Sequence, residues 1–405
     1  MTVAEREKAV LWSTYARAPR EFTRGEGVRL WDADGREHLD FLGGIATVAA
    51  GHANPHVNTA IISQLGRLGH ASNLYFTGPQ IELAGRLVAN AGIDGGRVFF
   101  GNSGAEANEA AIKAARRWGR ANRGDDVVDI IATEGAFHGR TLATLAATGK
   151  PALHPPFAPL PEGFSHVPYG DLDALAAAIT PTTAAVLLEP IQGEAGIMVP
   201  PDGYLAAARA LTRERGILLL MDEVQGGMGR TGRFLASLGE LGPGDRPDVV
   251  TLAKALGNGF PIGACLAAPE VAEAMRPGDH GSTFGGGPVA CAAAMATLDV
   301  IEPLLGPGGH VEKMGVRLAD GLRDLLPGIP GDSAEVRGRG LWLALDLGDA
   351  GDAKAVAGAA LDRGLVVNPV TGSALRVAPP LTVTAEEIDE AVARLATALS
   401  DAGVT

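Results

Sequence analysis

ILLLMDEVQ (217–225) and DVVTLAK (248–254) are the two stretches of sequence that decide the fold. Each contains an uninterrupted aliphatic run, which is typical of a strand buried on both faces of a parallel sheet. Alanine-rich stretches of helical length lie between several such runs, so the middle of the chain alternates strands with helices. We therefore expect an α/β fold with a mostly parallel sheet. The further aliphatic runs are 98–100, 127–132, 184–188 and 262–267, and the helical stretches include 105–121 and 203–215.

The two ends of the chain have a different pattern. Residues 20–41 alternate apolar and polar side chains around a central Asp-Gly pair, which predicts a β-hairpin. From about residue 305, shorter strands precede a final helix that begins with the capping pair Thr384 and Glu387. The Pro-rich stretch 151–163 is interpreted as a surface loop. In an open α/β sheet, ligands bind beyond the carboxyl ends of the strands, so the residues that follow each run are the candidates for function.

Composition excludes several classes of protein. With 46% hydrophobic residues over 405 positions, the chain can bury a large core, and whole-chain disorder is excluded. Its formal net charge of -13 repels phosphate backbones and anionic lipids, which argues against a nucleic-acid or membrane-surface protein. Two cysteines, Cys265 and Cys291, are too few for a disulfide framework or a metal site, and no stretch resembles a signal peptide or a membrane span. We expect a cytoplasmic protein without a metal.

Three polar segments that follow aliphatic runs are the strongest functional candidates. The segment GNSGAEANE (101–109) turns into a helix whose free N–H groups suit a phosphate, although a plain helix start has the same pattern. Neither a P-loop nor a dinucleotide fingerprint is present. Asp222 ends a buried strand, where it either caps a loop or holds a ring nitrogen protonated. Lys254 ends another buried strand. There it either reaches toward solvent or, because it is desolvated, acts as a neutral amine that forms a Schiff base.

A phosphate cradle, a strand-end aspartate and a strand-end lysine are together the set that pyridoxal 5′-phosphate requires. The cradle anchors the phosphate, Asp222 pairs with the pyridinium nitrogen, and Lys254 binds the aldehyde. An aromatic side chain suited to stack on the cofactor ring lies in AFHGR (136–140). The combination therefore predicts this cofactor, whereas no single segment does.

The same segments resemble the class III (subgroup II) aminotransferases, pyridoxal-phosphate enzymes of fold type I. The matching segments are NSGAEANEA (102–110), FHGRT (137–141), LEPIQGEAG (188–196), MDEVQGGMGRTG (221–232), LAKALGNGFPIGA (252–264) and STFGGGPVA (282–290). Within the class, the sequence is most similar to the acetylornithine aminotransferases. The resemblance implies a large domain with a seven-stranded, mostly parallel sheet, a small α+β domain built from both chain ends, and a homodimer with sites at its interface. The expected boundaries are 1–50 and 305–405 for the small domain and 51–304 for the large one.

The resemblance also implies a role for each matching residue around the cofactor. Lys254 would bind the cofactor and move the proton in the reaction, and Asp222 would pair with the pyridinium nitrogen. Gln225 would lie near the ring oxygen, and Phe137 would cover one face of the ring. His138 is expected to be structural, because the lysine transfers the proton in this family. The phosphate would be bound by Ser103, Gly104 and Ala105 and, from the partner subunit, by Thr283.

Four residues are implied to select the substrates. Arg376, in LRVAPPL (375–381), resembles the arginine that binds the α-carboxylate of glutamate or 2-oxoglutarate, a bidentate task suited to guanidinium. Glu194 resembles the carboxylate that neutralises this arginine while the ω-amino substrate is bound. Arg140 and Ser282 resemble the contacts to the carboxylate of acetylornithine, and a surface salt bridge is the alternative role for Arg140.

The predicted reaction moves the ω-amino group of N2-acetyl-L-ornithine to 2-oxoglutarate, a step of arginine biosynthesis. Related ω-aminotransferases that act on ornithine, succinylornithine, γ-aminobutyrate or acylated lysine-pathway intermediates share most of these motifs and stay open as alternatives. The ornithine enzymes carry a tyrosine where Ile45 stands here, and Gly287 replaces the asparagine that is usual in the class. A non-catalytic regulator that senses pyridoxal phosphate is disfavoured by the acidic charge, and a nucleotide-binding dehydrogenase by the missing dinucleotide fingerprint.

Overall fold

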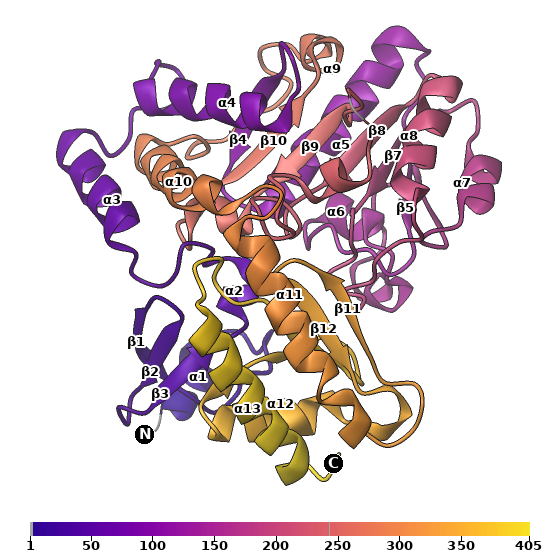
Figure 1. The fold of residues 1–405 in the computed structure, drawn as a ribbon. Helices are drawn as coiled ribbons and strands as arrows, with labels where there is room; N and C mark the ends of the chain where they lie inside the picture. The colour runs from indigo at the N-terminus through magenta and orange to yellow at the C-terminus, as the bar shows by residue number, and fades with distance from the viewer. Residues whose placement is uncertain (1–2, 243) are drawn as a thin grey trace.

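The structure is a computed structural model that describes residues 3–242 and 244–405. A seven-stranded sheet forms the centre of the larger lobe, in the strand order β4-β10-β9-β8-β7-β5-β6 (Figure 1). Neighbouring strands are parallel except at β10, which runs antiparallel to β4 and β9. The expected α/β fold with a mostly parallel sheet is confirmed. The strands are β4 (Arg97–Gly101), β5 (Asp129–Thr133), β6 (Phe164–Val167), β7 (Thr183–Leu188), β8 (Leu218–Asp222), β9 (Val249–Leu252) and β10 (Gly263–Ala267).

Helices surround the large sheet and extend through the smaller lobe (Figure 1). The predicted helices 105–121 and 203–215 correspond to α5 and α8. In the described part of the chain, no helix is long and apolar enough to span a bilayer. The helices are α1 (Val3–Val10), α2 (Gly43–Ala46), α3 (Pro55–Arg67), α4 (Gly78–Ala91), α5 (Gly104–Asn122), α6 (Leu142–Ala147), α7 (Leu172–Ala178), α8 (Tyr204–Arg215), α9 (Pro269–Ala274), α10 (Pro288–Ile301), α11 (His310–Arg323), α12 (Ala353–Asp362) and α13 (Ala385–Asp401).

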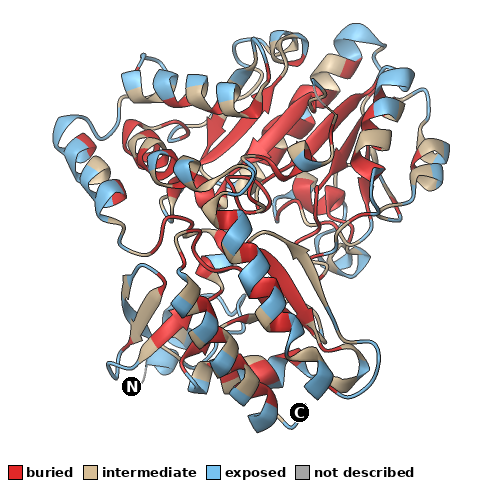
Figure 2. Cartoon of the chain, in the orientation of Figure 1, coloured by how far each residue is buried: buried red, intermediate tan, exposed pale blue. Residues whose placement is uncertain are grey.

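Apolar layers on both faces of the sheet explain its continuous aliphatic runs. Along β8, Leu218 and Leu220 belong to an apolar cluster that includes residues of α5 and α9. Leu219 and Met221, which point the other way, belong to a second cluster that includes residues of α10. The central strands are therefore buried along their whole length (Figure 2). An alternating polar pattern would have placed unpaired polar groups under one helix layer.

Both ends of the chain build the smaller lobe, in the lower half of Figure 1. One sheet has the order β1-β2-β3-β13, and there β13 pairs in parallel with β3. The other has the order β11-β12-β15-β14. The predicted hairpin and the capping box of Thr384 and Glu387 are confirmed, whereas the domain boundaries at residues 50 and 304 stay a prediction. The strands are β1 (Phe22–Glu26), β2 (Arg29–Asp32), β3 (Glu37–Asp40), β11 (Glu335–Arg339), β12 (Trp342–Asp346), β13 (Leu365–Val366), β14 (Asn368–Pro369) and β15 (Ala374–Val377).

One strand of the large sheet was not expected from the sequence. The edge strand β6 has the sequence FSHV and contains no aliphatic run, because an edge strand is paired and covered on fewer sides than a central one. The Pro-rich stretch 151–163 before it forms two short 3₁₀ turns, η1 (Pro151–Leu153) and η2 (Pro155–Phe157), and a connecting loop. Most of its residues are exposed or half-buried, as expected for a surface loop.

Candidate active site

A cavity of about 410 Å³ lies where the carboxyl ends of the central strands meet. Its walls come from the residues after β5, β7, β8 and β9 and from the N-terminus of α5. Strand ends far apart in the sequence converge here because parallel strands end at the same edge of a sheet. Eight of the residues predicted for the cofactor and substrate line this cavity: Ser103, Gly104, Ala105, Phe137, Arg140, Asp222, Gln225 and Lys254.

Asp222 is held in a buried hydrogen-bond network at the end of β8. Its Oδ2 atom accepts a hydrogen bond from Asn108 Nδ2 at 2.7 Å and lies 2.8 Å from His138 Nδ1. Its Oδ1 atom accepts from the backbone N–H of Val224 at 3.0 Å. Asn108 is fixed in turn, because its Oδ1 accepts from Thr251 Oγ1 at 2.7 Å and its Nδ2 also reaches the carbonyl of His138. These bonds compensate the burial of the carboxylate and fix its orientation.

Lys254 lies directly after β9, on a strained stretch of backbone. Its φ is +37°, in the left-handed region that costs a residue other than glycine about 1–3 kcal/mol. Burial lowers the pKa of its ammonium group; the charge of Glu194 opposes this shift, and that of Arg376 adds to it. A lowered pKa increases the share of neutral amine, the form that attacks an aldehyde.

The N-terminus of α5 forms a wall of the cavity that suits an anion. Ser103 caps the helix, because its Oγ accepts a hydrogen bond from the backbone N–H of Glu106 at 3.2 Å. The next N–H groups, of Gly104 and Ala105, belong to the first turn, which has no intrahelical acceptors. Gly263 packs against this turn so closely that a Cβ there would lie 2.2 Å from the carbonyl oxygen of Ser103. The glycine is therefore required for the geometry of the turn.

Phe137 is positioned by a carboxylate that sequence reasoning missed. The backbone N–H of Phe137 donates to Glu189 Oε1 at 2.9 Å, and Glu189 also lines the cavity. Burial raises the pKa of Glu189 to about 7; the neighbouring His138 opposes this shift and Asp222 adds to it. Arg140 is exposed at the mouth of the cavity, with its guanidinium carbon 5.4 Å from the centre of the Phe137 ring.

Arg376 comes to the site from the smaller lobe, on β15. Its Nη1 donates to Glu194 Oε1 at 2.5 Å and to Gln225 Oε1 at 2.8 Å, and its Nη2 donates to Asn368 Oδ1 at 2.7 Å. The side chain is 2% exposed, and its Nε has no partner in the described chain. Burial alone would raise the pKa of Glu194. The charge and hydrogen bond of Arg376, with contributions from Lys254 and Lys150, hold that pKa below its usual value.

Four predicted residues are not part of the cavity lining: Glu194, Ser282, Thr283 and Arg376. Arg376 is connected to the cavity by its hydrogen bond to Gln225, and Glu194 by its hydrogen bond to Arg376. Ser282 is connected to the cavity through Asn102, whose Nδ2 donates to Ser282 Oγ at 3.2 Å. Thr283 is exposed and lines a separate surface hollow beside Phe284. The prediction for Thr283 concerns the cofactor of a partner subunit and is not tested by a single chain.

Sequence reasoning missed three residues around the site, and two of them carried a usable signal. Glu189 follows an aliphatic strand directly, which is the same signal that identified Asp222. Asn108 is a lone amide in the alanine-rich start of α5, one turn after Gly104, on the face that contacts the sheet. Asn368 offered no signal, because its position beside Arg376 depends on the pairing of β14 with β15.

The chemistry of these groups fits pyridoxal 5′-phosphate. The N-terminus of α5 would hold the phosphate, Asp222 the protonated ring nitrogen, and Lys254 the aldehyde, while Phe137 would lie against the ring. All four line one cavity, and among the described residues the buried Asp222 has no arginine or lysine partner that would make it purely structural. Within the described residues, no group of three or more His, Cys, Asp or Glu side chains is placed to hold a metal ion.

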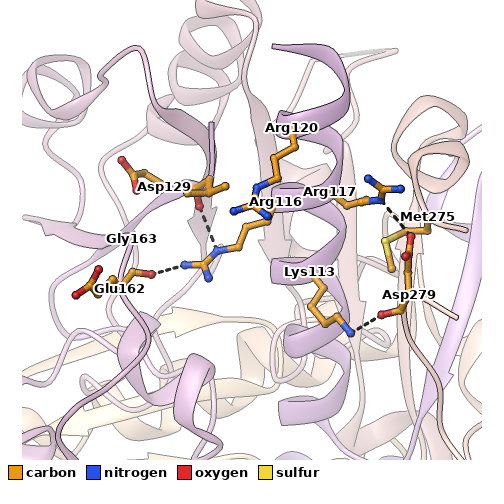
Figure 3. A pocket seen from close by; sticks show the side chains of 10 residues that line it. Lys113, Arg116, Arg117, Arg120, Asp129, Glu162, Gly163, Met275 and Asp279 are labelled. Atoms are coloured by element: carbon orange, nitrogen blue, oxygen red, sulfur yellow. Dashed lines mark hydrogen bonds and ion pairs between the residues drawn. The ribbon is translucent and has the colours of Figure 1, made fainter. Parts of the chain in front are cut away.

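A second hollow, of about 550 Å³, lies along the outer face of α5 (Figure 3). It is lined by four cationic side chains, Lys113, Arg116, Arg117 and Arg120. Lys113 donates to the Asp279 carbonyl at 2.6 Å, Arg117 pairs with the Asp279 carboxylate at 3.1 Å, and Arg116 donates to two backbone carbonyls. Because most of these cations already have partners and acidic side chains share the lining, the hollow has no feature that identifies a ligand.

Comparison with known proteins agrees with this geometry. The family model described as aminotransferase class-III matches residues 13–399. An acetylornithine aminotransferase from Methanothermobacter thermautotrophicus is 46% identical over 98% of this chain and 98% of its own length, and one from Mycobacterium tuberculosis is 50% identical over 97% and 95%. The crystal structure of the ornithine aminotransferase from Toxoplasma gondii matches with a TM-score of 0.91 at 34% identity, covering 98% of this chain and 94% of that one. The chain therefore belongs to the class III aminotransferases, enzymes that depend on pyridoxal 5′-phosphate.

Proposed function

We propose that this aminotransferase moves the ω-amino group of N2-acetyl-L-ornithine to 2-oxoglutarate, giving N-acetyl-L-glutamate 5-semialdehyde and L-glutamate in arginine biosynthesis. The observation that carries the proposal is the buried pair of Arg376 and Glu194 beside Lys254. Such a pair suits an enzyme that binds a diacid in one half-reaction and a less anionic chain in the other. The two relatives named above, both acetylornithine aminotransferases, support the choice of amino donor.

The residues around the cofactor would act as follows. Pyridoxal 5′-phosphate, when bound, supplies an electrophilic aldehyde carbon and an electron-withdrawing ring. Lys254 would bind that aldehyde and, once released, take a proton from the substrate carbon that bears the amino group and deliver it to C4′ of the cofactor. Asp222 would keep the ring nitrogen protonated, and Phe137 would exclude water from one ring face. Gln225 would lie near the ring oxygen while its own carbonyl accepts from Arg376.

Substrate choice would depend on the substrate end of the site. While the amino donor is bound, Glu194 would neutralise Arg376; when 2-oxoglutarate enters, its α-carboxylate would take the place of Glu194 on the guanidinium. The unpartnered Nε of Arg376 gives the incoming carboxylate a further donor. The carboxylate of the acetylornithine donor would be bound at the mouth, by Arg140 and by Ser282.

Ornithine is the second candidate donor, because a solved ornithine aminotransferase matches 98% of this chain with a TM-score of 0.91. Ornithine differs from its acetyl derivative by a free, charged α-ammonium group. Ile45, which stands where the ornithine enzymes carry a tyrosine, is 40% exposed and has no acceptor for that group. We therefore place acetylornithine ahead of ornithine.

We also propose that the working form is a homodimer in the cytoplasm. Large apolar side chains are exposed on the residue after Thr283 and on three consecutive residues of an earlier segment. Such exposed apolar side chains indicate a surface that another subunit covers. They are Leu74 (84% exposed), Tyr75 (70%), Phe76 (96%) and Phe284 (67%). A partner subunit would then bring its Thr283 to the phosphate. Both cysteines are free and buried, which suits a reducing compartment.

A single-turnover titration of the cofactor-loaded enzyme tests the function. N-acetylornithine, ornithine and γ-aminobutyrate are added separately, without a 2-oxo acid, and the loss of the cofactor absorbance is followed. Fast loss with N-acetylornithine alone supports the proposal. Faster loss with ornithine or γ-aminobutyrate would leave the family assignment intact and refute the proposed donor.

A further inference from the structure

Lys150 lies beside the Arg376–Glu194 pair and has no role in the function described so far. It follows Gly149, which bridges to Glu134 at the end of β5. Its Nζ donates to the backbone carbonyl of Glu194 at 2.7 Å. No carboxylate lies within ion-pair distance of Lys150 in the described chain, so its charge contacts only a neutral acceptor. The side chain is half-buried, and a cation held there without an anionic partner calls for an explanation.

The proposed exchange of carboxylates on Arg376 creates a need for such a cation. Glu194 gives Arg376 Nη1 one of its two acceptors, so a substrate carboxylate can take that place only when Glu194 leaves. The Glu194 side chain is 27% exposed, and a carboxylate released there is only partly hydrated. A partly buried charge without a partner is costly, and the release is therefore unfavourable unless a second cation receives it.

We propose that Lys150 is the second partner of Glu194, and that it determines how readily Arg376 becomes free for a diacid. The proposal rests on the proposed function, because it assumes that Arg376 binds the α-carboxylate of 2-oxoglutarate. The ammonium is already anchored on the main chain of Glu194, so a rotation of the Glu194 side chain brings the carboxylate toward it. A flexible lysine can follow that rotation, and its charge already contributes to holding Glu194 ionised. Lys254, the other neighbouring cation, is committed to the cofactor.

Equilibrium binding of glutarate to the cofactor-loaded enzyme tests this role. Glutarate is a five-carbon diacid without an amino or oxo group, so it binds without reacting, and calorimetry measures its Kd. Lys150→Gln removes the charge and keeps a hydrogen-bond donor, whereas Lys150→Arg keeps the charge. We expect Lys150→Gln to weaken glutarate binding about tenfold and Lys150→Arg to restore most of it. The single-turnover rate with the amino donor should change less than about twofold, because Glu194 stays on Arg376 in that half-reaction.

A second substitution separates this role from the alternatives. In a Glu194→Ala background the released carboxylate no longer exists, so Lys150→Gln should have no further effect on glutarate binding. If Lys150→Gln weakens glutarate binding as much in that background as in the wild type, the proposal is refuted. Lys150 would then act through the backbone carbonyl of residue 194, which alanine retains, or attract the diacid directly. No effect of Lys150→Gln in the wild-type background would refute it as well.

Two controls make the outcome unambiguous. Retention of the cofactor absorbance shows that each variant is folded and loaded, and Lys150→Met is the second charge-removing variant if the glutamine fails. Arg376→Ala distinguishes the two proposals. If Arg376→Ala leaves glutarate binding unchanged, the proposed diacid site is wrong; if it weakens binding while the Lys150 variants do not, only the role of Lys150 is wrong.

Discussion

The cofactor end and the substrate end of the site are built differently. Asp222 at the cofactor end is held by Asn108, by His138 and by the backbone N–H of Val224, which all belong to the larger lobe. At the substrate end, Arg376 arrives from the smaller lobe, and its partners Glu194 and Gln225 belong to the larger one. The first arrangement fixes one geometry that both half-reactions use. The second consists of charged groups, and in the proposed function an exchange of their partners would distinguish one half-reaction from the other.

The largest effect should follow from removing the group that both half-reactions require. Lys254→Ala deletes the amine that we propose binds the aldehyde and transfers the proton, so turnover should fall roughly 10⁵-fold or more. The absorbance typical of the lysine-bound cofactor should disappear with it, as a spectrum of the purified variant will show. Lys354→Ala is the matched control, since that lysine is exposed on α12 and has no role in the site. Retained transamination in Lys254→Ala would overturn the assignment of the site.

Asp222→Asn tests whether the cofactor end serves both half-reactions equally. The substitution keeps the size of the side chain and removes the charge that would hold the ring nitrogen protonated, so both rates should fall about 10³-fold. Stopped-flow absorbance with each substrate alone measures them separately. The comparison between the two ends would fail if only one half-reaction slowed.

Arg376→Ala should affect the two half-reactions unequally. Losing the guanidinium should lower kcat/KM for 2-oxoglutarate on the order of 100-fold, because a charge-assisted bidentate contact is lost. The half-reaction with the amino donor should change only a few-fold. Equal losses for both substrates, seen in the same stopped-flow assay, would show that Arg376 is structural.

The smallest effect concerns Glu223, the buried residue after Asp222. In the part of the chain that the structure describes, no lysine or arginine forms an ion pair with it. Burial raises the pKa of Glu223 to about 7, although its oxygens accept backbone N–H groups of Ala236 and Ser237. A carboxyl with a raised pKa binds its proton more tightly in the folded state. Its contribution to stability is therefore present at low pH and is lost as the pH rises from about 4.5 through about 7.

Urea unfolding of the wild type and of Glu223→Gln measures this contribution. Relative to the wild type, the free energy of unfolding of the variant should rise by about 2 kcal/mol between about pH 5.5 and about pH 8. Glu335→Gln, on an exposed strand residue, is the control and should show no such trend. A difference between wild type and Glu223→Gln that does not vary with pH would contradict the raised pKa.

The sequence predicted the cofactor end of the site better than the substrate end, for a physical reason. Asp222 and Lys254 end aliphatic strands, and parallel strands bring such ends together whatever the length of chain between them. Glu189 follows β7 in the same way, so the same pattern marks it as a candidate. The position of Arg376 beside Glu194 follows from how two lobes pack, and no local pattern encodes that packing. The resemblance to a known family, rather than periodicity, led to this pair.

Lys150 marks the limit of what the sequence could predict. Nothing in TGKPALH (148–154) distinguishes it from a solvated surface lysine, and its contact depends on how two loops after different strands meet. The edge strand β6 was missed for a related reason, since its pairing with β5 and not its composition makes it a strand. Residues that derive their role from a neighbouring segment have no signal of their own.

The pairing of β13 with β3 has a consequence for synthesis of the protein. Leu39 and Asp40 leave the ribosome more than 300 residues before Leu365 and Val366, their partners in the parallel ladder. At about 5–20 residues per second, the edge of β3 stays without that neighbour for roughly 15–60 s, and Arg376 is synthesised later still. During that time the nascent chain has an open strand edge and an incomplete substrate site. A chain shortened at its C-terminus would therefore lack activity altogether, and its exposed edge would favour association with chaperones or other chains.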